Sequence, residues 1–241
     1  MVKRKSMIHL ITACNSKYTT SAEKLGISAY KHGVNNFSCW DIDLIAPVIK
    51  RMFGENPKEE NRGWFYIWKP YVIWEVMQKI TEGDILIYSD AGQLLTDSVK
   101  PLIDKMDENI MLFNNPWKHI EWCKADIIDA INQIEVPAFE GGFKIETYKQ
   151  VQASFIIFRV CPDTINFVKE WMLWCMMPGF CDNSPSYLPN FPTFQEHRWD
   201  QAVLTCLQIK YAYNLHPFPS VENMDAPYRI INHHRKTNDQ W

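Results

Sequence analysis

Asp90 is the acidic residue whose surroundings in this sequence most suggest chemistry. The apolar run from Ile85 to Tyr88 precedes it and is opened by the turn residues Gly83 and Asp84. A run this short, bounded by turn residues, predicts a strand that is buried on both faces. Ligands of open α/β sheets bind beyond the carboxyl ends of the strands, so Asp90 occupies a position suited to a metal ion or a phosphate. The alternative is that Asp90 only caps a turn.

Two cations lie upstream of this strand and are candidates for contact with phosphate oxygens. Lys69 precedes Pro70, which fits the first turn of a helix, and the N–H groups at the start of a helix attract anions. Arg62 is a second candidate cation in the same segment. For Lys69, a solvated side chain at the start of a helix is the alternative.

Further polar side chains gather in the second half of the chain. Residues 178–196 show neither a helical nor a strand pattern, and a loop of this length inside a compact domain is usually functional or disordered. His197, Asp200 and Gln201 follow it, at the entrance of a helix expected over residues 202–209. Asp200 is therefore a candidate for chemistry, with helix capping as its alternative role.

Two adjacent histidines, His233 and His234, follow the apolar residues Ile230 and Ile231 near the C-terminus, and two cations come directly after them. Side chains of neighbouring residues in an extended chain point to opposite sides. We therefore expect at most one of the two imidazoles to share a ligand with Asp90.

Strand and helix patterns alternate along the chain, which predicts an α/β fold. Because no segment rich in glycine, proline or serine divides the 241 residues, a single domain is favoured. Loops are expected at residues 54–63 and 140–142. Strands are expected at residues 7–13, 37–44, 85–88, 111–113 and 151–160. Helices are expected at residues 21–32, 45–53, 70–80, 98–108, 163–175 and 202–209, with one more in the second half of 117–131.

Composition argues against several classes of protein. The formal net charge of −3, with lysines and arginines scattered along the chain, disfavours nucleic-acid binding, which requires a clustered basic face. The seven cysteines form no Cys-x-x-Cys pair, so neither a zinc knuckle nor a disulfide framework is indicated, and reduced thiols in the cytoplasm are expected. The apolar run after the basic N-terminus barely reaches the length of a signal-peptide core, and no run reaches the roughly 18 residues of a transmembrane segment.

Several segments, taken together and in this order, resemble one enzyme group. They are Trp-Lys-Pro-Tyr at 68–71, Gly-Asp-Ile-Leu-Ile-Tyr-Ser-Asp-Ala-Gly at 83–92, Asp-Asn-Ser-Pro-Ser at 182–186, Glu-His-Arg-Trp-Asp-Gln at 196–201 and His-His-Arg-Lys at 233–236. The sequence resembles nucleotide-sugar glycosyltransferases of the GT-A fold, especially the capsule and surface-glycan type found in bacteria and large DNA viruses. The similarity covers most of the chain.

This resemblance implies a single GT-A type domain over residues 1–241, with a Rossmann-like, mostly parallel central sheet flanked by helices. Residues 1–95 would form the nucleotide-binding half, and residues 96–241 the half that binds the acceptor and the sugar. The implied activity is metal-dependent transfer of a hexose from a nucleoside-diphosphate sugar, with a UDP-sugar favoured. The implied acceptor is a hydroxyl of a glycan or glycoprotein.

The resemblance also implies roles for individual residues. The family carries an Asp-x-Asp motif that holds a divalent ion on the donor diphosphate, and the aligned triplet here is Tyr88-Ser89-Asp90. Only Asp90 inherits the metal role, together with His233 or His234, and an imidazole ligand favours Mn²⁺ over Mg²⁺. Asp200 and Gln201 match the catalytic pair beside the reacting sugar. The donor-binding candidates are Lys69, Arg62, Asp90, Ala91, Arg235 and Lys236, and the acceptor-binding candidates are Asp182, Ser184 and His197.

Two other functions remain open. The missing first acid of the Asp-x-Asp motif is compatible with a non-catalytic module that binds a nucleotide sugar or a glycan. A sugar nucleotidyltransferase is the other alternative, although such an enzyme carries a glycine-rich basic loop after its first strand, which residues 14–20 lack. A dinucleotide-binding or P-loop motif is also missing.

Overall fold

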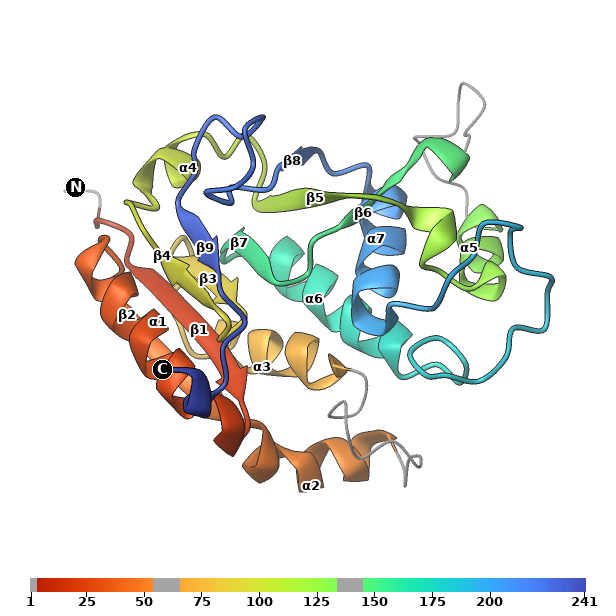
Figure 1. The fold of residues 1–241 in the computed structure, drawn as a ribbon, viewed down its shortest axis with the longest axis horizontal. Coiled ribbons are helices and arrows are strands. Elements are labelled where there is room, and N and C mark those ends of the chain that lie inside the picture. Colours follow the sequence, from red (N-terminus) through yellow and green to blue (C-terminus); the bar gives the residue numbers. More distant parts are fainter. Residues whose placement is uncertain (1–3, 54–65, 134–144) are drawn as a thin grey trace.

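A central sheet runs through the molecule and carries helices on both faces (Figure 1). The computed structural model describes residues 4–53, 66–133 and 145–241. Within these residues the sheet has seven strands in the order β2-β1-β3-β7-β5-β6, with β8 beside β5. Its strands are β1 (Ile8–Cys14), β2 (Asn36–Asp41), β3 (Ile85–Ser89), β5 (Ile110–Lys118), β6 (Lys149–Val151), β7 (Phe155–Arg159) and β8 (Leu215–Pro217). Strands from both halves of the chain therefore share one sheet.

Most strands of this sheet run in one direction. β2 and β3 both pair with β1 in parallel, and β7 pairs with β3 in antiparallel fashion. β5 is antiparallel to β7 and so runs with β3, and β8 is parallel to β5, whereas β6 is antiparallel to it. Five of the seven strands seen in the described residues thus point the same way, which confirms the expected α/β fold. A separate small sheet joins β4 (Gln93–Leu95) to β9 (Ile231–His233).

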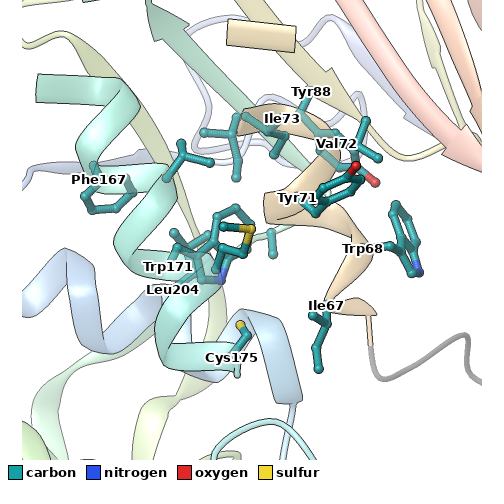
Figure 2. Close-up of a cluster of buried hydrophobic side chains, with 14 of the residues drawn as sticks. Ile67, Trp68, Tyr71, Val72, Ile73, Tyr88, Phe167, Trp171, Cys175 and Leu204 are labelled. Carbon is teal, nitrogen blue, oxygen red and sulfur yellow. The ribbon is translucent and has the colours of Figure 1, made fainter. Parts of the chain in front are cut away.

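The helices form two layers that β3 separates. Leu86 and Tyr88 face a cluster contributed by α3, α6 and α7, while Ile85 and Ile87 face a cluster that includes α1. Alternate side chains of a strand point to opposite faces, so both faces of β3 are buried as predicted. Figure 2 shows the first cluster, in which α3 packs against α6. The helices are α1 (Thr19–Lys31), α2 (Ile42–Phe53), α3 (Trp68–Met77), α4 (Lys100–Asp104), α5 (Ala125–Asn132), α6 (Pro162–Cys175) and α7 (Trp199–Tyr211).

Some predicted boundaries were wrong, for local reasons. The strand expected to end at Leu44 ends at Asp41, whose carboxylate accepts a hydrogen bond from the Asp43 backbone N–H at 2.8 Å and so starts α2 early. The helix expected over residues 98–108 is limited to α4, and the short strand expected at 111–113 is the longer β5.

The strand expected over residues 151–160 is interrupted. Residues 152–154 leave the sheet between β6 and β7, and their backbone groups bond to other parts of the molecule. The Ser154 carbonyl accepts a hydrogen bond from the Asp90 N–H at 2.8 Å, and the Ala153 carbonyl accepts one from Lys69 Nζ at 3.2 Å. The interruption therefore faces the carboxyl end of β3.

The loops expected at 54–63 and 140–142, and the candidate Arg62, lie outside the described residues. The described helices include none with the length and apolar character needed to cross a membrane.

Candidate active site

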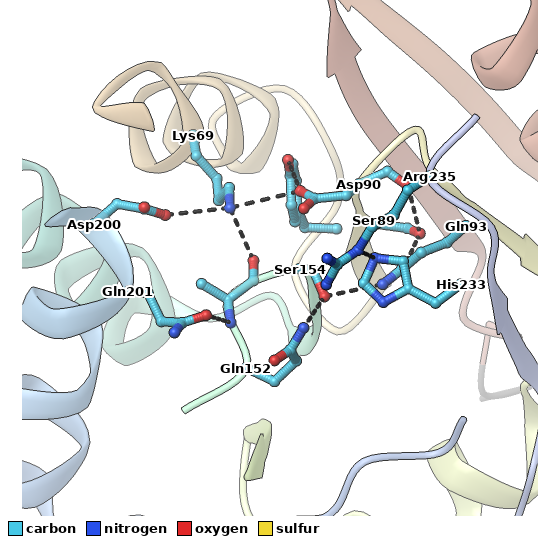
Figure 3. A network of polar contacts seen from close by, with 12 residues as sticks. Lys69, Ser89, Asp90, Gln93, Gln152, Ser154, Asp200, Gln201, His233 and Arg235 are labelled. Atoms are coloured by element: carbon cyan, nitrogen blue, oxygen red, sulfur yellow. Dashed lines mark hydrogen bonds and ion pairs between the residues drawn. The ribbon is translucent and has the colours of Figure 1, made fainter. Parts of the chain in front are cut away.

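A buried ammonium group joins the two candidate acids. Lys69 Nζ lies 3.2 Å from Asp200 Oδ2 and 3.5 Å from Asp90 Oδ1 (Figure 3). Three different elements place these side chains, because Lys69 lies in the first turn of α3, Asp90 follows β3 and Asp200 lies in the first turn of α7. The structure thus brings together residues that the sequence analysis selected separately. Lys69 is 4 % exposed, so it is not the solvated lysine considered as the alternative.

Burial and mutual attraction set the charges of this group. Burial alone lowers the pKa of Lys69, but the carboxylates of Asp200 and Asp90 outweigh it and the net pKa is raised. Burial raises the pKa of Asp200 to about 6, against the opposing effect of Lys69. At neutral pH Lys69 is therefore a cation and Asp200 a carboxylate.

Tyr88 fixes one oxygen of Asp90. Its hydroxyl, buried at the end of β3, donates a hydrogen bond to Asp90 Oδ1 at 2.6 Å. Burial and the nearby charge of Asp90 raise the pKa of Tyr88 well above its usual value, so the phenol stays a donor. In the described part of the chain no hydrogen bond reaches Asp90 Oδ2, and the Asp90 side chain is 36 % exposed. One carboxylate oxygen is therefore available to a ligand.

The turn at residues 152–154 connects the acids to their surroundings. The Gln201 side chain accepts the Ala153 N–H at 3.3 Å and donates to Gln150 Oε1 at 2.6 Å. The Ser154 hydroxyl receives hydrogen bonds from Gln152 at 2.6 Å and from Gln93 at 2.9 Å (Figure 3). Gln201 therefore positions this turn, which in turn holds the Lys69 ammonium.

The C-terminal segment approaches Asp90 through β9. β9 pairs with β4, and the His234 and Arg235 N–H groups donate to the Gly92 carbonyl at 3.0 and 3.1 Å. A Cβ at Gly92 would lie 3.1 Å from Arg235 Cα, so the two backbones approach closely because residue 92 is glycine. The exposed side chains of Arg235 and Lys236 follow, while Ala91 is buried against Cys14 and Ala22.

The two histidines have different neighbours. Burial and the charge of Arg235 lower the pKa of His233, and the nearby carboxylate of Asp90 opposes this shift. His234 instead accepts a hydrogen bond from the Lys236 N–H at 2.9 Å and packs edge-on against Trp241. Of the two imidazoles, His233 therefore lies in the electrostatic range of Asp90.

The residues around Asp90 fit a divalent metal ion. Asp90 offers an available carboxylate oxygen, and the lowered pKa of His233 keeps its imidazole neutral, as metal binding requires. A carboxylate and an imidazole suit Mn²⁺. With two protein ligands, the remaining coordination positions would fall to phosphate oxygens and water.

Two of the three acceptor-binding candidates line a pocket of about 410 Å³ formed mainly by residues 183–199. Ser184 and His197 line it, whereas Asp182 is not among the lining residues and accepts a hydrogen bond from the buried Lys124 Nζ at 2.9 Å. His197 donates a hydrogen bond from Nε2 to the Phe180 carbonyl at 2.7 Å, because a carbonyl oxygen can only accept. Burial lowers the pKa of His197 to about 3, so it is neutral. The pocket is lined by Lys124, Asn183, Ser184, Pro185, Ser186, Asn190, Phe194, Glu196, His197 and Trp199.

Trp199 links this pocket to the charged group, because it precedes Asp200 and its ring forms part of the wall. Its φ of 39° is in the left-handed region, which is unfavourable for a bulky side chain. The indole N–H donates to Asn183 Oδ1 at 2.8 Å and ties the first residue of α7 to the pocket.

Lys124 is a residue of this region that sequence reasoning missed. Its ammonium group also donates to the Gly179 carbonyl at 2.7 Å and to Ser184 Oγ at 3.2 Å. Asp126 accepts the backbone N–H groups of residues 187 and 188. The irregular segment 178–196 was predicted. The sequence around Lys124 does not indicate that Lys124 and Asp126 bind this segment.

Comparison with known proteins identifies the fold. No family model and no curated protein matches the sequence. The structure is similar to that of WbbM, a bifunctional glycosyltransferase, with a TM-score of 0.53 and 11 % identity over 90 % of this chain and 39 % of that one. It is also similar to a glycosyltransferase involved in the glycosylation of the major capsid of PBCV-1, with a TM-score of 0.53 and 11 % identity over 97 % of this chain and 96 % of that one.

The chain therefore has the α/β fold of these glycosyltransferases, as the sequence resemblance implied. It spans about two fifths of WbbM and nearly the full length of the second enzyme.

Proposed function

We propose that this chain is a metal-dependent glycosyltransferase that moves a hexose from a nucleoside-diphosphate sugar, preferably a UDP-sugar, to a hydroxyl group of a glycan or glycoprotein. The observation that carries the proposal is the buried Lys69 ammonium between Asp90 and Asp200. Asp90 stands at the carboxyl end of β3, where open α/β sheets bind their ligands. The fold shared with solved glycosyltransferases supports the same conclusion.

The donor diphosphate needs positive charge, because negative charge develops on it as the bond to the anomeric carbon breaks. Asp90 and His233 would hold a Mn²⁺ or Mg²⁺ ion, which supplies Lewis-acid stabilisation of this leaving group. Arg235 and Lys236 lie exposed after β9 and add two further cations. Lys69 is surrounded by protein oxygens, so its main effect is to hold both carboxylates in place.

Asp200 is the candidate for contact with the reacting sugar. As a carboxylate at neutral pH it can accept the proton of the acceptor hydroxyl, which serves an inverting reaction, or orient the donor sugar in a retaining one. The pocket that continues from Trp199 offers amide, hydroxyl and carboxylate groups together with two aromatic rings. Such a combination suits a sugar acceptor, which presents hydroxyl groups and an apolar ring face.

A thermal-shift screen of nucleoside diphosphates and nucleotide sugars, with and without Mn²⁺, tests the proposal. A ligand present at about 100 times its Kd stabilises a protein by about 2.7 kcal/mol, which here is a rise in Tm of roughly 5–10 °C. We expect this rise for UDP and one UDP-sugar with Mn²⁺, and its loss in Asp90→Ala. Replacement of the exposed Asp107 by alanine is the matched control and should keep it.

The alternatives give different results. Tight metal-dependent binding of UDP without turnover of any donor would favour a non-catalytic binding module. Release of pyrophosphate from a nucleoside triphosphate and a sugar phosphate would favour a sugar nucleotidyltransferase. No shift with any nucleotide would count against the glycosyltransferase, the nucleotidyltransferase and a module that binds a nucleotide sugar, and would leave a glycan-binding module.

A further inference from the structure

A second cluster of ligand-forming side chains lies in the core, away from Asp90. His119, Cys123 and Cys206 each offer one ligand atom, and these atoms lie within 4.8 Å of one another. All three residues are at most 1 % exposed. Among the groups of three or more such side chains in the described residues, this is the one whose atoms come close enough to share an ion.

No local sequence pattern indicates this cluster. His119 lies in the short 3-10 helix after β5, Cys123 precedes α5 and Cys206 lies in the middle of α7. Cys206 is thus far along the chain from the other two, whereas zinc motifs recognised from sequence use closely spaced pairs. α5 packs against α7 (Figure 1), and this packing places the segment before α5, with His119 and Cys123, beside Cys206.

The imidazole of His119 is poorly satisfied by protein groups alone. Nε2 lies 3.3 Å from Cys206 Sγ, and sulfur is a weak hydrogen-bond partner. Nδ1 is buried and has no hydrogen-bond partner within the described part of the chain. A completely buried ring usually makes stronger hydrogen bonds than this, because a buried polar atom without a partner destabilises the fold.

We propose that His119, Cys123 and Cys206 bind one Zn²⁺ ion with a structural role. Thiolate and imidazole are the ligands that zinc prefers, and in a tetrahedral site with Zn–S near 2.3 Å and Zn–N near 2.0–2.1 Å the nitrogen and sulfur atoms lie about 3.5 Å apart. The 3.3 Å between His119 Nε2 and Cys206 Sγ is close to this separation. A backbone carbonyl would complete the shell, because structural zinc sites are closed to water and all three ligand residues are buried.

Charge balance selects zinc over copper. Two thiolates and a neutral imidazole carry two negative charges, so Zn²⁺ leaves the buried site neutral, whereas Cu⁺ leaves one net negative charge. An uncompensated charge in the core is costly. Binding of zinc by two thiols releases their two protons to solvent, and no electron is transferred.

The zinc ion would stabilise α7, the helix that carries Asp200. Cys206 lies on this helix, and His119 and Cys123 lie on the segment that leads from β5 into α5. The ion would therefore cross-link two segments that otherwise meet through apolar packing of Ile120, Ile127 and Ala202.

Metal analysis and cobalt substitution of the full chain test this inference. Untagged protein, purified without chelator, should contain about one zinc per chain, as a structural site implies. After the zinc is removed, Co²⁺ should produce the near-ultraviolet sulfur-to-metal charge-transfer absorption of a thiolate site. Cys206→Ser should lose both signals. Cys175→Ser is the matched control, because Cys175 is an equally buried thiol beside Cys181, and it should keep both.

Asp90→Ala should also keep the zinc and the cobalt absorption, which separates this site from the proposed donor site. If Cys206→Ser fails to fold, the wild-type zinc content and cobalt spectrum still decide. Wild-type protein without zinc and without the thiolate absorption would overturn the inference. Binding of Cu⁺ in preference to zinc, or an unchanged cobalt spectrum in a folded Cys206→Ser variant, would overturn it as well.

Discussion

Replacement of Lys69 by methionine removes the ammonium group between two carboxylates and keeps most of the side-chain volume. At an effective dielectric constant of about 20, opposite unit charges 3.2 Å apart attract by about 5 kcal/mol. Removal of one member of a buried ion pair costs about 3–5 kcal/mol, because it leaves an uncompensated charge. We therefore expect Lys69→Met to lower the free energy of unfolding by this amount, equivalent to roughly 6–20 °C in Tm for a chain of this size.

Addition of Asp200→Asn to Lys69→Met shows whether the lost stability comes from electrostatics or from packing. The double variant Lys69→Met with Asp200→Asn lacks both the Lys69 cation and the Asp200 carboxylate. No uncompensated charge is then left at residue 200, and most of the lost stability should return. Urea unfolding of the wild type, both single variants and the double variant gives the coupling free energy, which should be at least about 2 kcal/mol. Single-variant effects that add within about 0.5 kcal/mol would refute the account of a coupled pair.

The pH dependence of the Lys69→Met effect has a definite sign. Burial raises the pKa of folded Asp200 to about 6, above its ordinary value, and loss of the cation raises this pKa further. A carboxyl group with a raised folded-state pKa destabilises the fold when charged and regains stability as the pH falls through that pKa. The cost of Lys69→Met should therefore shrink between pH 7 and pH 5. An equal or larger cost at pH 5 would contradict this reasoning.

The geometry around the site can be tested by three further measurements. Donor turnover should require Asp200 as a carboxylate, so kcat/KM should fall as the pH drops through about 6, and a profile flat to pH 5 would contradict this. His233→Ala should weaken Mn²⁺ binding by at least roughly tenfold, as measured by electron paramagnetic resonance. His234→Ala should leave Mn²⁺ binding nearly unchanged, and the reverse order of effects would assign the metal to His234. Gly92→Ala should cost about 1–3 kcal/mol in urea unfolding, since the new methyl group meets the C-terminal backbone at 3.1 Å, and wild-type stability would disprove this contact.

The position of Asp90 could be predicted because it depends on local sequence. A short apolar run opened by Gly83 and Asp84 predicts a buried strand without reference to distant residues. Asp90 directly follows this strand and therefore lies at the carboxyl edge of the sheet. Gly83 adopts φ of +85°, and Asp84 binds the Met7 N–H at 2.8 Å, so the turn that opens β3 also ties it to the start of β1.

The environment of the lysines could not be predicted, because it depends on residues far along the chain. The pattern around Lys69 indicates the start of a helix. It does not indicate that Lys69 is buried beside the carboxylate of Asp200, which lies in α7. Lys124 is buried in the same way by Asp182. Likewise, residues 152–154 have the apolar and β-forming neighbours of a strand, yet their backbone leaves the sheet to bind Lys69 and Asp90.

Turnover of the donor tests the central claim most directly. UDP release from a panel of UDP-sugars should be measured with Mn²⁺ for the wild type, Asp200→Asn and the exposed-site control Asp107→Asn. The account predicts turnover of at least one donor by the wild type and the control, and a loss of about 10²–10⁴-fold in Asp200→Asn, the range expected for a group that transfers a proton in the reaction. Turnover by Asp200→Asn at the rate of the wild type would contradict the account. Absence of UDP release by all three proteins would contradict it as well.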